Sequence, residues 1–463
     1  MIALRIAFRS LLRRKSRMLL IALLVVFGTV LIVFGQTLTR SAAAAARQSI
    51  IGNFTGDFIL YSARSRELPS PFAFNTPLPN IQNADAVVAW LKQQPEVSAV
   101  VPLAQNYSIL SVDAKGGKVE LPFIFYAVDP ATYAATFHNV KMVAGDFMTS
   151  GSGVLVSSNQ NDQYQKKYGI RLAVGDEVTV LGLSDGGGVN AYKTRVRGIF
   201  DPLYYKNVFN YINFIDVGTY SGVYNFTGVA AGSLPASLEK GLAATGTSED
   251  DIFALATTPS AAIDTSTLKS ETVSGYTMIA VLLKDHGAAA SVIARATGQD
   301  LGIKAARWDE ASGFFSRISS ALQAFIFLAT ALIFLVVAFI FMNTLIINIV
   351  ERTAEIGTMR ALGAERKFVR RIFLAETLLL NVAASLVGIA VGLAMILAAG
   401  RGGLPLPDTV SQFLIGGGSL PLLLSPWPFV VALTVVIAVS VLATILPIRV
   451  ATRITPLAAM SDR

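Results

Sequence analysis

Four long apolar runs constrain the fold of this chain more than any other feature. They are Met18–Gly35, Ile318–Val350, Phe373–Gly400 and Trp427–Ile448. About 20 apolar residues in a helix cross the roughly 30 Å hydrocarbon core of a bilayer, so each run is long enough to span a membrane. Only 15% of the 463 residues are charged, against about a quarter in an average soluble domain. The sequence therefore predicts a membrane protein with four transmembrane helices.

The basic residues gather in short segments beside these runs. Six lie among the first 17 residues without an acid, six lie with three acids in 351–371, and three lie with one acid after Ile448. The stretch from Thr37 to Arg317 holds 22 basic and 24 acidic residues. Lys and Arg concentrate on the cytoplasmic side of membrane proteins. We therefore expect both termini and the 351–371 loop in the cytoplasm, and no nucleic-acid partner.

The apolar runs and the charges divide the chain into nine segments. The first run is interpreted as an uncleaved anchor rather than a cleaved signal peptide, because it is too long and Arg40 follows before a convincing cleavage site. The second holds 33 uncharged residues, about 50 Å of helix, so part of it should extend beyond the bilayer as a stalk. In chain order we predict a cytoplasmic amphipathic N-terminal helix (1–17), a first span (18–39), an extracytoplasmic domain (40–316), a second span with its stalk (317–350), a cytoplasmic loop (351–371), a third span (372–400), a short external loop (401–426), a fourth span (427–448) and a cytoplasmic tail (449–463).

The large segment between the first two spans predicts an α/β domain with a β-rich insertion. Strand, helix and strand signals occur at both of its ends, at Phe54–Tyr61, Ala84–Gln94 and Val97–Val112, then at Tyr276–Leu283, Ala288–Thr297 and Ile303–Trp308. We interpret them as two similar β-α-β halves. Four further segments between the halves are typical of strands: Glu120–Val128, Gly153–Ser157, Glu177–Leu181 and Thr194–Phe200.

Few side chains are suited to catalysis or to metal binding. The chain has no cysteine and two histidines, His138 and His286, which lie far apart in the sequence. This pattern excludes thiolate chemistry and a His-rich metal centre. No Gly-x-x-x-x-Gly-Lys-Ser/Thr loop occurs to cradle phosphates. We therefore assign no catalytic residue, no metal and no cofactor to this chain, and expect it to be a non-catalytic membrane subunit.

The most specific stretch follows the second span. It reads Glu351-Arg352, then Glu355-Ile356-Gly357, then Arg360-Ala361-Leu362-Gly363. On spacing alone, an ordinary juxtamembrane helix with solvated charges explains it equally well. The pattern resembles, however, the ER-x-x-EIG-x-x-RA-x-GA signature of the MacB/FtsX/LolC (LolE) family of ABC-transporter permeases.

Other motifs resemble the same family and extend the resemblance over nearly the whole chain. In the external domain they are Gly145-Asp146-Phe147, Gly153–Ser157, Val174-Gly175-Asp176 and Val196–Phe200. The tail from Leu446 onward is similar to the closing pattern of the family, although Ile448 and Val450 stand where small residues are commoner.

The resemblance implies a permease subunit of an ATP-driven transporter in the cell (inner) membrane. Its partners would be a cytoplasmic ABC ATPase dimer that carries ATP and Mg, a second permease chain, identical or paralogous, and a periplasmic carrier or adaptor. The family acts by mechanotransmission, in which ATPase closure moves a coupling helix and drives the external domain. The implied ATPase-coupling residues are Glu351, Arg352, Glu355, Ile356, Gly357, Arg360, Ala361, Leu362 and Gly363.

Several functions within this family fit the sequence. Lipoprotein extraction of the LolC/LolE type and MacB-like export are both open. The alternative is an FtsX-like transmembrane signalling scaffold, which activates cell-wall hydrolases without transport.

A stripe of large apolar side chains along the second run suggests where a substrate would pass. Packing against lipid or another helix is the ordinary explanation of such a stripe. The run carries no charge, which argues against an ion or proton path, whereas a lipid-bearing or amphipathic substrate needs an apolar one. We predict a laterally open cavity between the first and second spans of two permease chains, lined by Phe325, Leu328, Leu332, Leu335 and Phe339.

Overall fold

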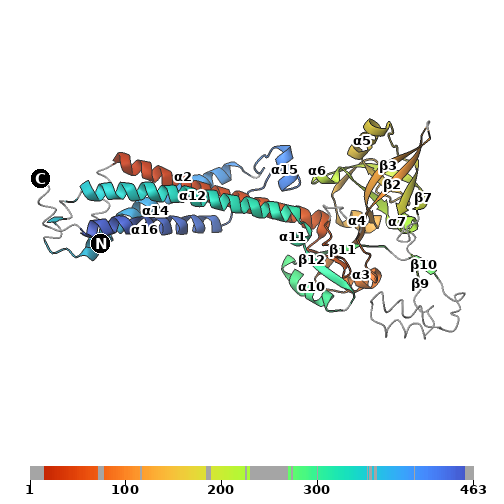
Figure 1. The fold of residues 1–463 in the computed structure, drawn as a ribbon, viewed down its shortest axis with the longest axis horizontal. Helices are drawn as coiled ribbons and strands as arrows, with labels where there is room; N and C mark the ends of the chain where they lie inside the picture. Colours follow the sequence, from red (N-terminus) through yellow and green to blue (C-terminus); the bar gives the residue numbers. More distant parts are fainter. Residues whose placement is uncertain are drawn as a thin grey trace. The chain divides into compact units, whose positions relative to one another are not determined.

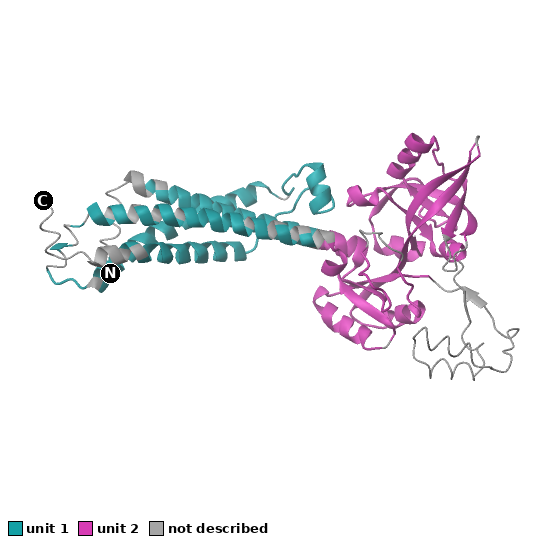
Figure 2. Cartoon of the chain, in the orientation of Figure 1, with its two compact units in different colours: residues 1–46, 315–463 teal, residues 47–314 magenta. Residues whose placement is uncertain are grey.

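The computed structural model describes residues 15–70, 78–114, 117–183, 189–224, 227–229, 270–272, 275–299, 301–351, 353, 357–358, 362–400 and 402–453. The chain divides into two compact units, which Figure 2 shows in different colours. Unit 1 comprises residues 1–46 and 315–463, and unit 2 comprises residues 47–314. Figure 1 labels the long helices α2, α12, α14 and α16, which belong mainly to unit 1, and the strands of the sheet, which belong to unit 2.

Unit 1 is helical in its described part. Its helices are α2 (Lys15–Ile50, which continues into unit 2), α12 (Phe314–Glu351), α14 (Arg366–Ala398), α15 (Asp408–Leu414) and α16 (Trp427–Arg453). Among the described residues, three helical stretches are long and apolar enough to cross a membrane: Ile21–Thr55, Lys367–Ala398 and Trp427–Ile445. Helix α12 contains a shorter apolar stretch, Phe327–Ile340, so the second of the four expected spans stays a prediction.

Close packing of α14 against α2 and α16 holds unit 1 together. A Cβ atom built on Gly388 would lie 2.7 Å from the Cβ of Thr29, and one on Gly392 would lie 2.9 Å from a valine of α2. This small-x-x-x-small spacing lets two helix backbones approach closely in a membrane. On the other side, Nδ2 of Asn381 donates a hydrogen bond to Oγ of Ser440 in α16 at 2.7 Å. The two sets of contacts fix α14 between its neighbours.

The segment predicted as a short external loop, 401–426, contains a helix as well. Helix α15 lies inside it, and Leu404 and Leu420 form an isolated antiparallel bridge that closes the loop around α15. Seven residues of helix among many Gly and Pro residues leave too short a periodic signal to recognise from sequence.

Unit 2 is built on one mixed ten-stranded sheet. Its strands run in the order β12-β1-β11-β2-β3-β8-β5-β7-β4, and β6 pairs with β2 and β7. Two pairs, β3 with β8 and β5 with β7, are parallel, and the others are antiparallel. The bounds are β1 Phe58–Ser62, β2 Val97–Ala114, β3 Gly117–Val128, β4 Val140–Gly145, β5 Val154–Ser157, β6 Glu177–Leu183, β7 Val189–Pro202, β8 Ile212–Asp216, β11 Met278–Leu283 and β12 Ile303–Arg307, with β9 Thr227–Val229 and β10 Ser270–Thr272 as a separate pair.

The two predicted β-α-β halves are confirmed. They are β1, α3 (Ala84–Lys92) and β2, and then β11, α10 (Ala289–Thr297) and β12. The halves interleave, because β11 lies between β1 and β2 and β1 lies between β12 and β11. Apolar side chains on the inner faces of α3 and α10, such as Val87, Leu91 and Val292, are buried in one core with this four-stranded part. We call this part the four-stranded lobe.

The predicted β-rich insertion is also confirmed, and we call it the β-rich lobe. Its core gathers buried residues of β3, β5, β6 and β7 together with Tyr164 and Tyr220. Tyr164 belongs to α5 and Tyr220 to α7. The sequence interpretation omitted all four helices of this lobe, which are α4 (Pro130–Thr136), α5 (Ser158–Tyr168), α6 (Lys206–Phe209) and α7 (Val217–Tyr224). The other short helices of unit 2 are η3 (His286–Ala288) and α11 (Trp308–Ala311).

The predicted strand Phe54–Tyr61 was wrong over its first residues. Residues Ile51–Thr55 form a π-helical turn, η1, that continues α2, and β1 begins only at Phe58. The turn ends at Gly56, whose φ of +64° favours glycine. A Cβ atom on Gly56 would lie 2.3 Å from the carbonyl oxygen of Val281. The close approach to β11 therefore stops the helix and starts the strand.

Candidate functional site

A large cavity lies within unit 1 between α2, α12 and α16. Its volume is about 1060 Å³, at the upper end of the roughly 300–1,000 Å³ of small-molecule sites. Most of its surface is apolar and comes from α12 and α16. The lining residues are Ile32, Gln36, Thr39, Arg40, Ala43, Phe327, Thr330, Ala331, Phe334, Leu335, Ala338, Phe339, Met342, Val431, Val435, Val439, Leu442 and Ala443.

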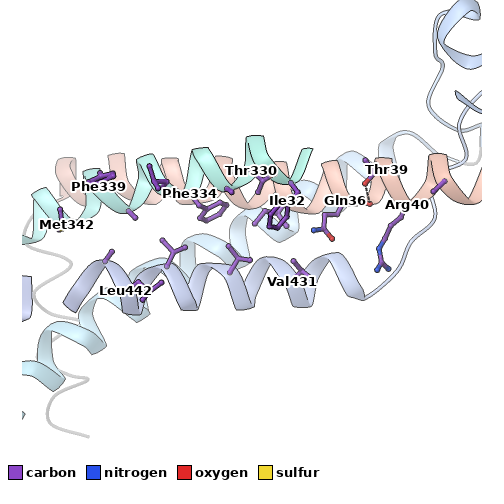
Figure 3. A pocket seen from close by; sticks show the side chains of 18 residues that line it. Ile32, Gln36, Thr39, Arg40, Thr330, Phe334, Phe339, Met342, Val431 and Leu442 are labelled. Atoms are coloured by element: carbon purple, nitrogen blue, oxygen red, sulfur yellow. Dashed lines mark hydrogen bonds between the residues drawn. The ribbon is translucent and has the colours of Figure 1, made fainter. Parts of the chain in front are cut away.

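The polar groups of the cavity gather at one end. Gln36, Thr39 and Arg40 follow one another at helical spacing on one face of α2, and Figure 3 shows Gln36 and Arg40 directed from α2 toward α16. The Arg40 guanidinium lies 5.6 Å from the ring centroid of Trp427, at the start of α16. The hydroxyl of Thr39 donates a hydrogen bond to the carbonyl of Gly35 in its own helix at 3.0 Å, which leaves Gln36 and Arg40 as the polar groups of α2 available to a ligand.

The five predicted cavity residues share one stripe of α12, and the structure places two of them in the cavity. Leu335 and Phe339 line the cavity, whereas Phe325, Leu328 and Leu332 do not, and all five side chains are more than half exposed. Four other residues of α12 that line the cavity each directly precede a residue of the predicted stripe in the sequence: Phe327, Ala331, Phe334 and Ala338. One position along an α-helix is a rotation of about 100°, so the predicted stripe is centred beside the cavity. A cavity shared between two chains stays a prediction.

Four of the nine predicted coupling residues are described. Glu351 ends α12 and is exposed, Gly357 is helical and buried, Leu362 is 88% exposed in a turn, and Gly363 follows it. Gly363 has a φ of +94° and open space around its missing Cβ, so the turn itself requires a glycine there. The other residues lie outside the described part of the chain: Arg352, Glu355, Ile356, Arg360 and Ala361.

A surface depression of about 560 Å³ adjoins this turn. Leu362 and Gly363 form one side, and the first turns of α14 form the other with Glu365, Lys367 and Phe368. An exposed apolar residue beside charges of both signs is suited to a protein partner rather than to lipid. The sequence interpretation treated the residues after Gly363 only as part of the basic segment 351–371.

The end of α2 is fastened to the β-rich lobe in a way that sequence reasoning missed. Phe54 in the π-helical turn is 4% exposed and stacks on Phe209, with centroids 4.2 Å apart, while Tyr205 contacts it edge-on at 5.7 Å. Nδ2 of Asn139 donates a hydrogen bond to the carbonyl oxygen of Asn53 at 2.8 Å. Tyr205 has a φ of +49°, a conformation rare for an aromatic residue, and burial raises the pKa of its hydroxyl so that it stays neutral.

The same end of α2 is fastened to the four-stranded lobe through Asp57. This carboxylate accepts a hydrogen bond from the amide of Leu283 at 2.8 Å and lies 2.6 Å from Nδ1 of His286. The amide of Trp308, which precedes α12, donates to the carbonyl of Asp57 at 3.1 Å. The guanidinium of Arg47 in α2 lies 5.8 Å from the Trp308 ring centroid. The chain thus enters and leaves unit 2 on neighbouring, paired strands, β1 and β12.

Comparison with known proteins finds partial matches to this chain. The model of the FtsX-like permease C-terminal family matches residues 327–456. The macrolide export ATP-binding/permease protein MacB of Hyphomonas neptunium is 25% identical over 255 residues, which is 54% of this chain and 36% of that protein. The protein of the same name from Rhodopirellula baltica is 33% identical over 119 residues, 26% of this chain and 15% of that one. The matched part of the chain thus spans about a third or less of these relatives.

Solved structures are also similar to part of the chain. The periplasmic region of MacB from Actinobacillus actinomycetemcomitans aligns over 57% of this chain and 92% of its own, with 12% identity and a TM-score of 0.30. The extracellular domain of the transporter YknZ from Gram-positive bacteria aligns over 54% and 99%, with 10% identity and a TM-score of 0.27.

The family match includes the turn at Leu362–Gly363 and helices that line much of the cavity. It covers α12 from residue 327 to its end, and all of α14 and α16. Among the described residues, no group of three or more His, Asp or Glu side chains is placed to hold a metal ion. The matches to known proteins support an ABC-transporter permease of the MacB/FtsX family.

Proposed function

We propose that this chain is the membrane subunit of an ATP-driven transporter that transmits motion to an extracytoplasmic domain. A separate cytoplasmic ATPase dimer supplies the energy, and a second permease chain completes the complex. In this proposal α2, α12, α14 and α16 span the inner membrane, both termini are cytoplasmic, and unit 2 lies on the far side.

One observation carries the proposal: the two helices that lead into unit 2 end on directly paired strands. Helix α2 continues through η1 into β1, and β12 leads through α11 into α12, with Phe58 opposite Arg307 in the sheet. A displacement of one helix relative to the other would therefore shear two adjacent strands. Packed sheets resist such shear and move as rigid bodies, so the displacement would pass to the lobes rather than be absorbed locally.

The coupling turn and its depression supply the cytoplasmic end of this path. The exposed Leu362 side chain offers an apolar anchor, and Glu365 and Lys367 offer charges that orient a partner. An ATPase seated there would act on the segment that joins α12 to α14. The residues of the signature between Glu351 and Gly363 are proposed to make this contact.

The cavity favours transport over signalling. A scaffold that only activates hydrolases has no need of an apolar space of about 1060 Å³ beside α2 and α12. Lipoprotein extraction and the export of an amphipathic molecule would both need such a space, and they would differ in the periplasmic carrier or adaptor that receives the substrate. The FtsX-like scaffold is the second candidate.

Co-purification from the native host tests the proposal. The tagged chain is purified in mild detergent, and proteins bound to it are identified by mass spectrometry. We expect a cytoplasmic ABC ATPase with the wild-type chain and much less of it with Leu362→Asp, which places a charge on the exposed anchor. Tyr168→Asp, at an exposed aromatic position of unit 2, is the matched control. Recovery of an intact chain without any ATPase would refute the proposal.

A further inference from the structure

We propose that the cavity of unit 1 binds an anionic phospholipid, with the lipid phosphate held by Arg40. The orientation of the cavity rests on the proposed function, but the binding requires neither ATP hydrolysis nor transport.

The first argument is charge. Arg40 is the one charged residue in the cavity lining, and among the described residues no carboxylate lies within ion-pair distance of it. An arginine beside an apolar space is costly without an anionic partner. Its planar guanidinium presents donors that match the oxygens of a phosphate.

The second argument is geometry at the polar end. The Trp427 ring packs near the guanidinium, at 5.6 Å. Such a cation–π contact uses no hydrogen-bond acceptor, so the N–H donors of the guanidinium receive none from the ring. Gln36, one turn earlier on the same face of α2, adds an amide that can donate to an ester or phosphate oxygen. Together these groups form a cradle for a head group.

The third argument is depth and shape. Tryptophan side chains concentrate at the level of lipid head groups, so Trp427 places Arg40 at the height of the phosphates. From there the cavity continues along α12 and α16 past Phe334, Phe339 and Leu442. An apolar slot that starts at head-group level and runs toward the bilayer centre has the shape of an acyl chain site.

A second copy of this chain is a less suitable occupant. Helices α2 and α16 contain no acidic residue, α12 contains one, Glu351, at its last position, and the one in α14, Glu376, is buried within the chain. If such a helix filled the slot, Arg40 would be desolvated with no acid opposite, which is strongly unfavourable. A lipid phosphate supplies the missing charge.

Native mass spectrometry of the purified complex tests the inference. The complex is delipidated and titrated, without nucleotide, with phosphatidylglycerol or with phosphatidylcholine of the same acyl chains. We expect the wild type to prefer phosphatidylglycerol and Arg40→Gln to lose about tenfold or more of that preference, as expected for a charge-assisted hydrogen-bonded pair. Arg40→Lys should keep part of it. The matched control is Arg47→Gln, which removes the same charge seven residues later on the same helix, at Trp308.

A second variant separates head-group recognition from chain binding. Ala331→Trp fills the slot and should reduce the binding of both lipids without changing their ratio. Because the chain has no cysteine, Ala331→Cys also reports a second copy through a disulfide between chains. Equal binding of the two lipids by the wild type, an unchanged preference in Arg40→Gln, or an efficient Ala331→Cys disulfide would each overturn the inference. A lipid preference in a chain that recovers no ATPase would refute the proposed function alone.

Discussion

Replacing Phe54 by alanine should disconnect α2 from the β-rich lobe while the rest of unit 2 stays folded. The ring is 4% exposed and lies against Phe209 and Tyr205. Truncating a buried phenylalanine to alanine costs about 3–5 kcal/mol, of which two aromatic contacts account for about 0.5–1.5 kcal/mol each. Another contact of this joint, the hydrogen bond from Asn139 to Asn53, is worth only about 0.5–1.5 kcal/mol. The aromatic contacts therefore dominate this joint.

Hydrogen exchange of the complex with its ATPase, followed by mass spectrometry, measures the effect. In Phe54→Ala we expect faster exchange in η1 and in the segment 203–211 that carries Tyr205 and Phe209. We also expect nucleotide-dependent changes in the β-rich lobe, which the wild type should show, to be lost. Phe123→Ala is the matched control, because this ring is fully buried and stacked on Phe125 away from the joint.

The control distinguishes lost transmission from lost stability. Phe123→Ala should raise exchange throughout the β-rich lobe and yet keep its response to nucleotide. If Phe54→Ala kept a wild-type nucleotide response in that lobe, α2 would not drive it through this joint. The reasoning from the aromatic contacts would then be refuted.

Three further predictions concern packing, a buried carboxylate and the membrane face of α12. Gly388→Ala should lower the thermal stability of the detergent-solubilised chain, because its Cβ meets α2 at 2.7 Å, whereas Gly52→Ala, with nothing within 4 Å, should leave it unchanged or raised by up to about 1 kcal/mol. Asp57→Ala leaves the buried amide of Leu283 without its side-chain acceptor and should lower the free energy of unfolding by about 1–3 kcal/mol. His286→Ala should lower it less, because the His286 side chain is 56% exposed. Chemical denaturation of the two variants compares these free energies. Leu328→Lys should block substrate passage between spans while ATPase activity persists, and normal transport by this variant would place substrate capture wholly in unit 2.

The elements of unit 2 were predictable where their periodicity was long and uninterrupted. The helices α3 and α10 bury one face each, and the second half of β7 alternates between buried and partly exposed residues. Helical spacing or alternation reveals such faces. Strand β2 is instead buried continuously over residues 100–105, and a run of apolar residues indicates it. Helix α5 was missed because its sequence is almost entirely polar, and only Tyr164 and a few neighbours turn inward. A polar helix on the outside of a sheet has no apolar stripe to detect.

The joint at the end of α2 illustrates what a sequence cannot specify. Phe54 lies in an apolar, β-favouring stretch, and that local preference predicts a strand. The π-helical turn forms because Phe209, Tyr205 and Asn139, 85 or more positions away, offer partners that a strand would not reach. Tertiary contacts therefore override the local preference at the position that matters most for the proposed motion.

The cavity shows the same limit in a helix. A stripe at helical spacing was recognised along α12, but a membrane helix that is apolar all round carries no sign of which face meets a helix and which meets a space. Polar residues resolve the ambiguity, and here they lie on α2 rather than on α12. Arg40 stood in the sequence as the residue that argued against signal cleavage, and the structure shows it at the mouth of an apolar slot.

Helix α2 thus carries two features that a coupled transporter would need on one element. Its face at Gln36 and Arg40 lines the proposed lipid site, and its end at Phe54 and Asp57 contacts both lobes of unit 2. A ligand shifts a conformational equilibrium only if it binds the two states with different affinity. If motion of α2 relative to α16 opens or closes the space between Arg40 and Trp427, the bound lipid differs between the states and must influence the joint. The nucleotide response of the β-rich lobe should then depend on anionic lipid in the wild type and lose that dependence in Arg40→Gln.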